Sequence, residues 1–518
     1  MDSIRKILLR NTLTNYVVLI WRMITSIFIT RFLFLGLGAE HYGFWALLWT
    51  IFGYSLLLDF GFGVSVQKFT AEVRVNKDMK EYNSLITAVL CTYLAITSVI
   101  IVMTFAAAPF LDTILSMAKN ADISYYKTVF IIFGIGAALV FPTGIFPEIL
   151  VGLNRTDLKN YVLFGTVTAN IIGIYTIYIL KYSLLALTVF SVSVNMISNL
   201  IMIVLVFKNF PGFRISPKFF HWSYVKKLGS FSIFAYIYAI SVVIIFRTDR
   251  TVLGIMLGME AVAVYQIGTR LSEMMQQLTT QFQKSLAPVT VTLFKNNEKE
   301  RFKWVLMRSA RITLFVSTLF FIIFFILVKQ IMFIWLKVDN PNSIKIAHIM
   351  LISIYVTVIF KTPFLKSIQM AGKHKFVAYL SIAEGIVNIL LSVYLVHTLK
   401  TNPVLGVAYG TIVPGLFFSI FLFFPVAAKF TGIKMSYYIT KVFLPIILVV
   451  IPPLAILICA TKYIPFASWN IFYLAAITGG TTLIYFISGL FFYIKKDERE
   501  KFLDALPMKD KIPFLNKL

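Results

Sequence analysis

Long apolar runs separated by short charged loops make up almost the whole sequence. About 20 apolar residues of helix span the hydrocarbon core of a bilayer, and each run is about that long or longer. The pattern therefore predicts an all-α, multi-pass membrane protein with about fourteen transmembrane helices. The predicted spans are 16–37, 43–66, 84–108, 128–151, 161–180, 183–207, 229–258, 261–283, 312–336, 346–370, 376–398, 404–428, 442–461 and 469–494.

The composition agrees with a membrane protein. Of 518 residues, 59% are hydrophobic and 14% are charged, and the mean hydropathy is +0.85. Soluble domains average about 25% charged residues. The formal net charge of +26 would suggest a nucleic-acid partner in a soluble protein. Because no long basic region lies outside the apolar runs, we exclude that partner and expect the excess Lys and Arg to meet anionic membrane lipids.

The positive charges also predict the topology. If the N-terminus lies inside, most Lys and Arg outside the spans fall on the inner side, with the densest loop at 284–311. Cytoplasmic loops collect these residues. We therefore expect an even number of spans, with the N- and C-termini both cytoplasmic.

A short string occurs twice in the chain. Leu37-Gly38-Ala39-Glu40 recurs 220 residues later as Leu257-Gly258-Met259-Glu260, and an arginine precedes each copy. Six predicted spans lie between the copies, so the two halves would have the same orientation, as in transporters built from parallel repeats. The alternative is a chance match of a short string. The repeat predicts six-helix lobes at 1–215 and 216–430, followed by two additional helices and a cytoplasmic tail at 431–518.

Charged residues inside the spans are concentrated in the first two helices of each repeat. Such a charge costs about 2.5–3.5 kcal/mol on insertion scales, so it generally faces a cavity and has a function there. Arginine binds phosphate in bidentate fashion and stays charged when desolvated. The sequence thus predicts a cationic cavity for an anionic lipid-linked substrate. The candidate contacts to the substrate head are Arg22, Arg31, Arg247, Arg250, Arg270 and Lys361.

The acidic residues in the same spans are candidates for taking up a coupling ion, namely Asp59, Asp249 and Glu273. Each candidate also has a simpler interpretation. Arg22 and Arg31, nine residues apart and so on roughly opposite sides of one helix, could extend to the headgroups, and Asp249 could form a structural ion pair with Arg247 or Arg250. The five histidines lie in loops or at span ends and no phosphate-binding loop motif occurs, so we expect no metal and no cofactor. Because no predicted outer loop is long enough to hold catalytic groups and the chain contains a repeat, we also expect no enzyme activity.

The run from Arg31 to Leu47, followed by Leu58-Asp59-Phe60-Gly61-Phe62-Gly63 and a basic loop, resembles bacterial polysaccharide-export flippases of the O-antigen type. These belong to the superfamily that includes multidrug and toxin extruders and the lipid II flippase. The resemblance implies two lobes around a V-shaped cavity, alternating access, and transport of undecaprenyl-diphosphate-linked oligosaccharide to the outer leaflet of the bacterial inner membrane. It also implies that arginines of spans one and seven contact the substrate head, and that proton or sodium entry drives transport.

Other functions stay open at this point. One is an ion-coupled antiporter of drugs or other small solutes, although the excess of basic residues argues against cationic drugs. Another is a polysaccharide polymerase or ligase, which generally needs an outward catalytic loop that no predicted loop is long enough to form. A scaffold protein of a polysaccharide assembly complex, with no transport activity of its own, is the third alternative.

Overall fold

A computed structural model describes residues 2–116, 122–337, 339–368 and 374–493. Most residues in these ranges are helical, and the described residues include no strand. The chain divides into two compact units. The first unit contains residues 1–266 and 381–410, and the second contains residues 267–380 and 411–518.

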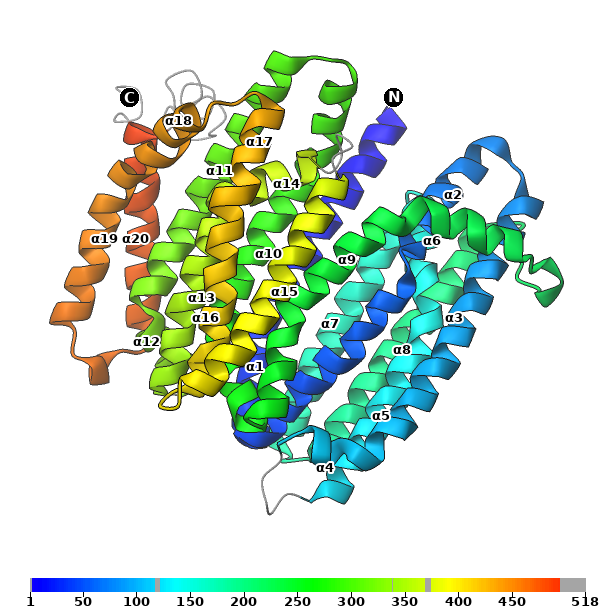
Figure 1. The fold of residues 1–518 in the computed structure, drawn as a ribbon, viewed down its shortest axis with the longest axis horizontal. Helices are drawn as coiled ribbons and strands as arrows, with labels where there is room; N and C mark the ends of the chain where they lie inside the picture. Colours follow the sequence, from blue (N-terminus) through cyan, green and yellow to red (C-terminus); the bar gives the residue numbers. More distant parts are fainter. Residues whose placement is uncertain (1, 117–121, 338, 369–373, 494–518) are drawn as a thin grey trace. The chain divides into compact units, whose positions relative to one another are not determined.

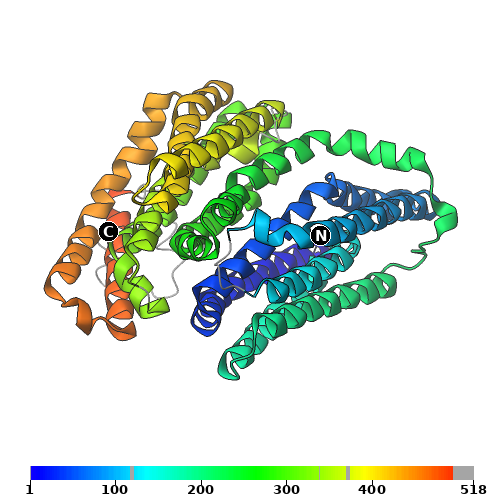
Figure 2. The ribbon, with the colours of Figure 1, turned by 60° about the horizontal axis from the view of Figure 1, so that its bottom comes forward.

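The first unit is built from long helices that pack side by side (Figure 1). Helix α1 packs along α7, α7 packs against α8, and α8 packs against α5, which in turn contacts α3. The second view shows the same blue, cyan and green helices adjacent to one another (Figure 2). The main helices of this unit are α1 (Asp2–Ile51), α2 (Phe62–Asn76), α3 (Met79–Ala107), α5 (Ile123–Val140), α6 (Ile145–Gly152), α7 (Thr156–Ile179), α8 (Leu184–Asn209), α9 (Trp222–Met256) and the start of α10 (Met259–Lys295).

Short helical elements join them: η1 (Phe52–Asp59), η2 (Ala108–Phe110), α4 (Leu111–Ile114), η3 (Phe141–Gly144) and η4 (Pro217–Phe219). Parts of α15 (His374–Thr398) and α16 (Pro403–Phe417) also belong to the first unit.

In the second unit, α11 packs against both α13 and α19, and α19 packs along α20. Its elements after α10 are α11 (Lys299–Ile326), α12 (Val328–Leu336), α13 (Pro341–Phe360), α14 (Thr362–Ile368), η6 (Phe418–Phe423), α17 (Phe424–Thr431), α18 (Met435–Tyr438), η7 (Ile439–Phe443), α19 (Leu444–Tyr463), η8 (Phe466–Ser468) and α20 (Ile471–Phe492).

Each predicted span corresponds to a helical segment as far as the described residues reach; residues 369–370 and 494 of two spans, and the predicted cytoplasmic tail after them at 495–518, lie outside the described residues. Eleven segments among the described residues are long and apolar enough to cross a membrane. The first, Leu13–Ser55, covers the predicted span 16–37 and the first part of the span 43–66, and between them the chain leaves helical geometry at Gly38, where φ is +79°. The remaining two are α9 and α10, with 35 and 37 residues.

The backbone repeats as well as the sequence. Gly38 and Gly258, 220 residues apart, have φ of +79° and +87°. Lys77 and Asn297 are also 220 residues apart and have φ of +57° and +58°. Positive φ is uncommon at residues other than glycine, so this second match is informative. It supports the repeat as a structural one, while the lobe boundaries at 215 and 430 remain a prediction.

Several spans that we expected as single helices contain breaks. The fourth is divided by η3 at Pro142, and the tenth breaks at Lys361 between α13 and α14. The second span changes from α1 into η1 and then turns through Phe60 and Gly61, both with positive φ, before α2 begins. Backbone of this kind is tolerated at membrane depth when it is buried in protein or lines a cavity.

The core of the first unit lies between α2, α3, α6 and α8, where Val66, Ile86, Ile149 and Val206 are fully buried. Association of helices in lipid depends on close packing, which small residues permit. Gly152 shows this, since a Cβ there would lie 2.7 Å from the carbonyl oxygen of Gln67 on α2. This packing fixes α2 and α6 next to each other, and both line the site described below.

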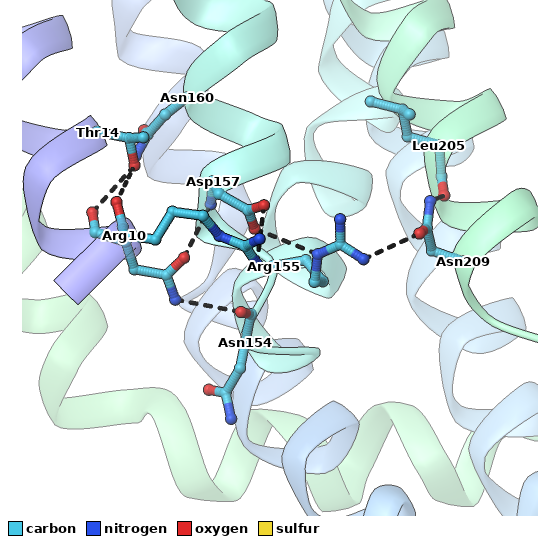
Figure 3. Close-up of polar contacts among 9 residues, drawn as sticks. Arg10, Thr14, Asn154, Arg155, Asp157, Asn160, Leu205 and Asn209 are labelled. Atoms are coloured by element: carbon cyan, nitrogen blue, oxygen red, sulfur yellow. Dashed lines mark hydrogen bonds and ion pairs between the residues drawn. The ribbon is translucent and has the colours of Figure 1, made fainter. Parts of the chain in front are cut away.

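A polar network joins α1, α7 and α8 at one end of the first unit (Figure 3). Asp157, which is only 2% exposed, forms ion pairs with Arg10 (Nη2–Oδ2, 3.1 Å) and Arg155 (Nε–Oδ1, 3.2 Å). Arg155 also donates to Oδ1 of Asn209 at 3.2 Å. Asn160 donates to the hydroxyl oxygen of Thr14 at 3.0 Å. The network therefore holds α1 at residues 10–14 against the start of α7.

Candidate functional site

A pocket of about 540 Å³ lies within the first unit. Its wall comes from the end of α1, η1, α2, α3, α5, η3, α6, α8 and α9. The polar side chains that line it are Ser55, Asp59, Gln67, Tyr93, Glu148, Ser191, Asn195 and Arg247. The aromatic ones, besides Tyr93, are Trp49, Phe52, Phe133 and Phe141.

Asp59 is placed in the pocket by the break in the second span. It is the last residue of η1, directly before the left-handed turn at Phe60 and Gly61. Its carboxylate accepts hydrogen bonds from the Tyr93 hydroxyl on α3 and from the backbone of Gly61 and Gly63. A carboxylate with several fixed donors is held in one orientation.

Glu148, in the first turn of α6, is the second carboxylate of the pocket. It accepts a hydrogen bond from Nε2 of Gln67 and forms an ion pair with Lys159 (Nζ–Oε1, 3.2 Å). A Cβ at Gly63 would lie 3.5 Å from Cγ of Glu148 and 3.7 Å from Oδ2 of Asp59. The two acidic side chains therefore flank Gly63 from different elements.

Arg247 brings a guanidinium from α9 to the same pocket. Its Nη1 donates to the carbonyl oxygen of Trp49 at 3.2 Å. It lies over Gly53, where a Cβ would be only 1.4 Å from Nη1, so this position requires glycine while Arg247 stays there. A guanidinium carries five N–H donors, so Arg247 can hold Trp49 and still present donors to a ligand.

The other predicted residues occupy different places. Arg22 and Arg31 are on α1, exposed and half-buried respectively. Asp249 is 4% exposed and accepts a hydrogen bond from the Tyr265 hydroxyl, and Arg250 is half-buried on α9. In the second unit, Arg270 and Glu273 form an ion pair at 3.1 Å and Lys361 is buried at the break between α13 and α14.

Of the nine predicted residues, Asp59 and Arg247 line this pocket. The pocket contains two carboxylates and one guanidinium, whereas the sequence led us to expect a lining with more cations than anions. Glu148, Gln67, Tyr93 and Asn195 were missed. Ser191 and Asn195 are four residues apart, a spacing that marks one helix face, so this part of the site could have been found from the sequence.

Residues 6–294, more than half of the chain, match the family model for polysaccharide biosynthesis proteins. The chain belongs to this family. A comparison with curated protein sequences gives no match.

Several solved structures share the fold. The lipid II flippase MurJ in an inward closed conformation superposes with a TM-score of 0.69 and 15% identity, covering 93% of this chain and 98% of MurJ. An inward-facing MATE multidrug transporter of the MOP superfamily gives a TM-score of 0.66 and 15% identity over 81% and 96% of the two chains. A MOP superfamily transporter from Pyrococcus furiosus gives 0.58 and 16% over 84% and 96%.

These identities are low, so the likeness shows the fold alone. The all-α membrane fold and the resemblance to the superfamily predicted from the sequence are both confirmed. The solved structures that share this fold are flippases and transporters. The chain is a multi-pass membrane protein.

Proposed function

We propose that this protein moves undecaprenyl-diphosphate-linked oligosaccharide, such as an O-antigen or other surface-polysaccharide repeat unit, from the cytoplasmic to the outer leaflet of the bacterial inner membrane. The family match at residues 6–294, in a chain with the fold of a lipid flippase, is the observation that carries this proposal. Transport would proceed by alternating access, with both termini cytoplasmic, and would supply lipid-linked units to a polysaccharide polymerase complex.

Arg247 is the proposed contact for the diphosphate in the first unit. Its guanidinium lines the pocket and is held at Trp49, so little side-chain freedom is lost on binding. Arg22, Arg31, Arg250, Arg270 and Lys361 remain further candidates for this role.

Asp59 is the proposed site of coupling to proton or sodium entry. Its carboxylate faces a pocket inside a helix bundle, where a charge is costly enough to indicate a function. Asp249 and Glu273 remain candidates, each with a hydrogen-bonding or ionic partner in the structure.

An ion-coupled antiporter of cationic drugs or other small solutes is the second candidate function. Two carboxylates and several aromatic rings line the pocket, and this chemistry suits an organic cation. The likeness to MATE transporters is compatible with this function, but Arg247 in the same wall disfavours a cationic ligand.

Deletion of the gene in its native host, followed by extraction of lipid-linked sugars, tests the proposal. We expect an undecaprenyl-diphosphate oligosaccharide to accumulate on the cytoplasmic leaflet and wild-type protein to clear it. Exported but unpolymerised intermediates would instead indicate a polymerase or ligase. An unchanged lipid-linked pool would exclude the flippase and favour the antiporter.

A further inference from the structure

We infer that the pocket of the first unit is a binding subsite for a sugar ring, and that it holds the sugar attached directly to the diphosphate. This inference rests on the proposed flippase function and adds to it the part of the cargo that the pocket recognises. A pyranose has hydroxyl groups around its edge and apolar C–H faces. The pocket has matching chemistry, because both fixed hydrogen-bonding groups and aromatic rings line it.

The polar part of the pocket presents oriented acceptors. Asp59 is held by Tyr93, and Glu148 by Gln67 and Lys159. An ionised carboxylate has about four acceptor positions, so each retains capacity for a hydroxyl donor.

Two amides extend this set of acceptors. Gln67 donates through Nε2 to Glu148, which orients its Oε1 as an acceptor. Asn195 donates through Nδ2 to the Ser191 carbonyl at 2.8 Å, which orients its Oδ1 in the same way. Several fixed acceptors in one small pocket suit a ligand with several hydroxyl donors.

The aromatic part of the pocket presents apolar surface. Trp49 is 48% exposed, so a large part of its surface is available for contact. It packs edge-on against Phe133, with ring centroids 5.3 Å apart. Aromatic side chains combine a large apolar surface with a fixed geometry, and the C–H face of a sugar can lie against such a surface. The backbone carbonyl oxygen of Trp49 accepts the hydrogen bond from Arg247, so the guanidinium lies next to the residue that provides this apolar surface.

The size of the pocket and its donors distinguish a sugar from a divalent metal ion. Pockets for small organic ligands have volumes of about 300–1,000 Å³, and this one has about 540 Å³. Tyr93, Gln67 and Lys159 already direct donors at the carboxylates, which leaves few oxygen ligands for a divalent ion. The described residues contain no group of three or more potential metal ligands among His, Cys, Asp and Glu. A proton or a single sodium ion at Asp59 needs little of the pocket volume, so ion coupling there remains compatible with a sugar in the pocket.

The position of Arg247 indicates which sugar of the cargo is bound. Gly53, over which Arg247 lies, is the second residue of η1, and Asp59 is its last. A 3₁₀-helix rises about 2 Å per residue, so the six residue steps from Gly53 to Asp59 span about 12 Å. A phosphate at Arg247 would therefore place the ring attached to it next to Asp59 and Glu148, while the following sugars would lie further from the guanidinium.

Binding to the purified full-length protein in nanodiscs tests this inference. The probes are undecaprenyl diphosphate without a sugar and the same lipid carrying one N-acetylglucosamine, galactose or glucose. We expect at least one sugar-bearing lipid to bind about fivefold more tightly than the bare lipid, the effect of about one additional hydrogen bond. In Asn195→Leu and in Gln67→Leu, the ratio of the two dissociation constants should fall toward one. Asn199→Leu, one turn further along α8 and outside the pocket lining, should keep the wild-type ratio.

Three other outcomes would contradict the inference, and each would contradict a different part of it. Equal binding of the bare and all three sugar-bearing lipids by the wild type would refute the subsite and leave the flippase function intact. A preference that survives in both pocket variants would show that the sugar is recognised elsewhere. Failure of the wild type to bind any of the four lipids would overturn the flippase proposal, and the subsite with it.

Discussion

Arg247 can reach the pocket because residue 53 is a glycine and has no side chain. Arg247 occupies the space where any other residue at position 53 would place its Cβ. Glycine in a helical segment lowers stability by about 0.5–1 kcal/mol relative to alanine. At position 53 glycine is nevertheless required, because any side chain would displace the Arg247 guanidinium from the pocket wall. Sequence reasoning selected Arg247 because of its depth in a span, but the role of Gly53 follows only from the packing of α9 against η1.

Gly53→Ala should therefore reduce transport as strongly as Arg247→Gln. The new methyl group would displace the flexible end of Arg247 without requiring a backbone shift, so thermal stability should be retained or slightly increased. Clearance of the lipid-linked intermediate in the deletion host, at matched protein levels, measures the effect. Gly165→Ala on α7 is the control, because no atom lies within 4 Å of its added Cβ. Wild-type clearance by Gly53→Ala would exclude a role for the Arg247 position.

Asp59→Asn tests coupling at the level of one carboxyl group. The amide has a similar shape and can still accept from Tyr93, but it can take up neither a proton nor a sodium ion with its former charge. We expect proteoliposomes containing Asp59→Asn to lose the dependence of flipping on a pH or sodium gradient. Tyr93→Phe, which removes only the hydrogen bond, should keep it. If the gradient dependence persists in Asp59→Asn, then Asp59 is not the coupling site.

At the scale of helices, the apolar runs were sufficient to predict where the chain is helical. A run of about 20 apolar residues in a bilayer must satisfy its backbone hydrogen bonds internally, and an α-helix does so within one segment. The repeated Leu-Gly-x-Glu string coincides with two positions, Gly38 and Gly258, where the backbone takes positive φ. The break between Ile51 and Phe62 was not predicted, because the residues of η1 are as apolar as those of a regular helix. Glu148 was missed for a related reason, since its place beside Asp59 depends on contact between elements far apart in the sequence.

The network around Asp157 gives a prediction at the same scale. Asp157→Ala would leave Arg10 and Arg155 without their shared carboxylate at the junction of α1 and α7 (Figure 3). Both arginines are partly exposed, at 45% and 36%, so the loss of stability should be about 1–3 kcal/mol rather than the larger cost of a fully buried pair.

A lower midpoint of thermal unfolding in detergent would show this loss. Arg301→Ala is the matched control, because its ion pair with Glu298 is on the surface and the arginine is 78% exposed. Exposed pairs of this kind contribute about 0–1 kcal/mol. Equal midpoints for the two variants would show that the Asp157 network does not stabilise α1.

At the scale of the whole molecule, family and fold agree on a membrane protein of polysaccharide biosynthesis with the architecture of a lipid flippase. Composition predicted the membrane class, and the repeat with its in-span charges predicted a transporter. The arrangement of the pocket could not be predicted, since it depends on breaks in helices and on glycines that allow close contact. The account of function rests on one chemical claim, that the cargo is a sugar joined to a lipid through a diphosphate.

Flipping by the purified protein tests that claim most directly. Proteoliposomes would contain undecaprenyl diphosphate bearing a fluorescent oligosaccharide, and a membrane-impermeant quencher would report how much label reaches the outer face. We predict that wild-type protein moves the label across the membrane and that Arg247→Gln slows this movement at least tenfold, the effect of losing about 1.4 kcal/mol of binding to a charged group. Equal rates with wild-type protein and with protein-free vesicles, under both pH and sodium gradients, would contradict the flippase account.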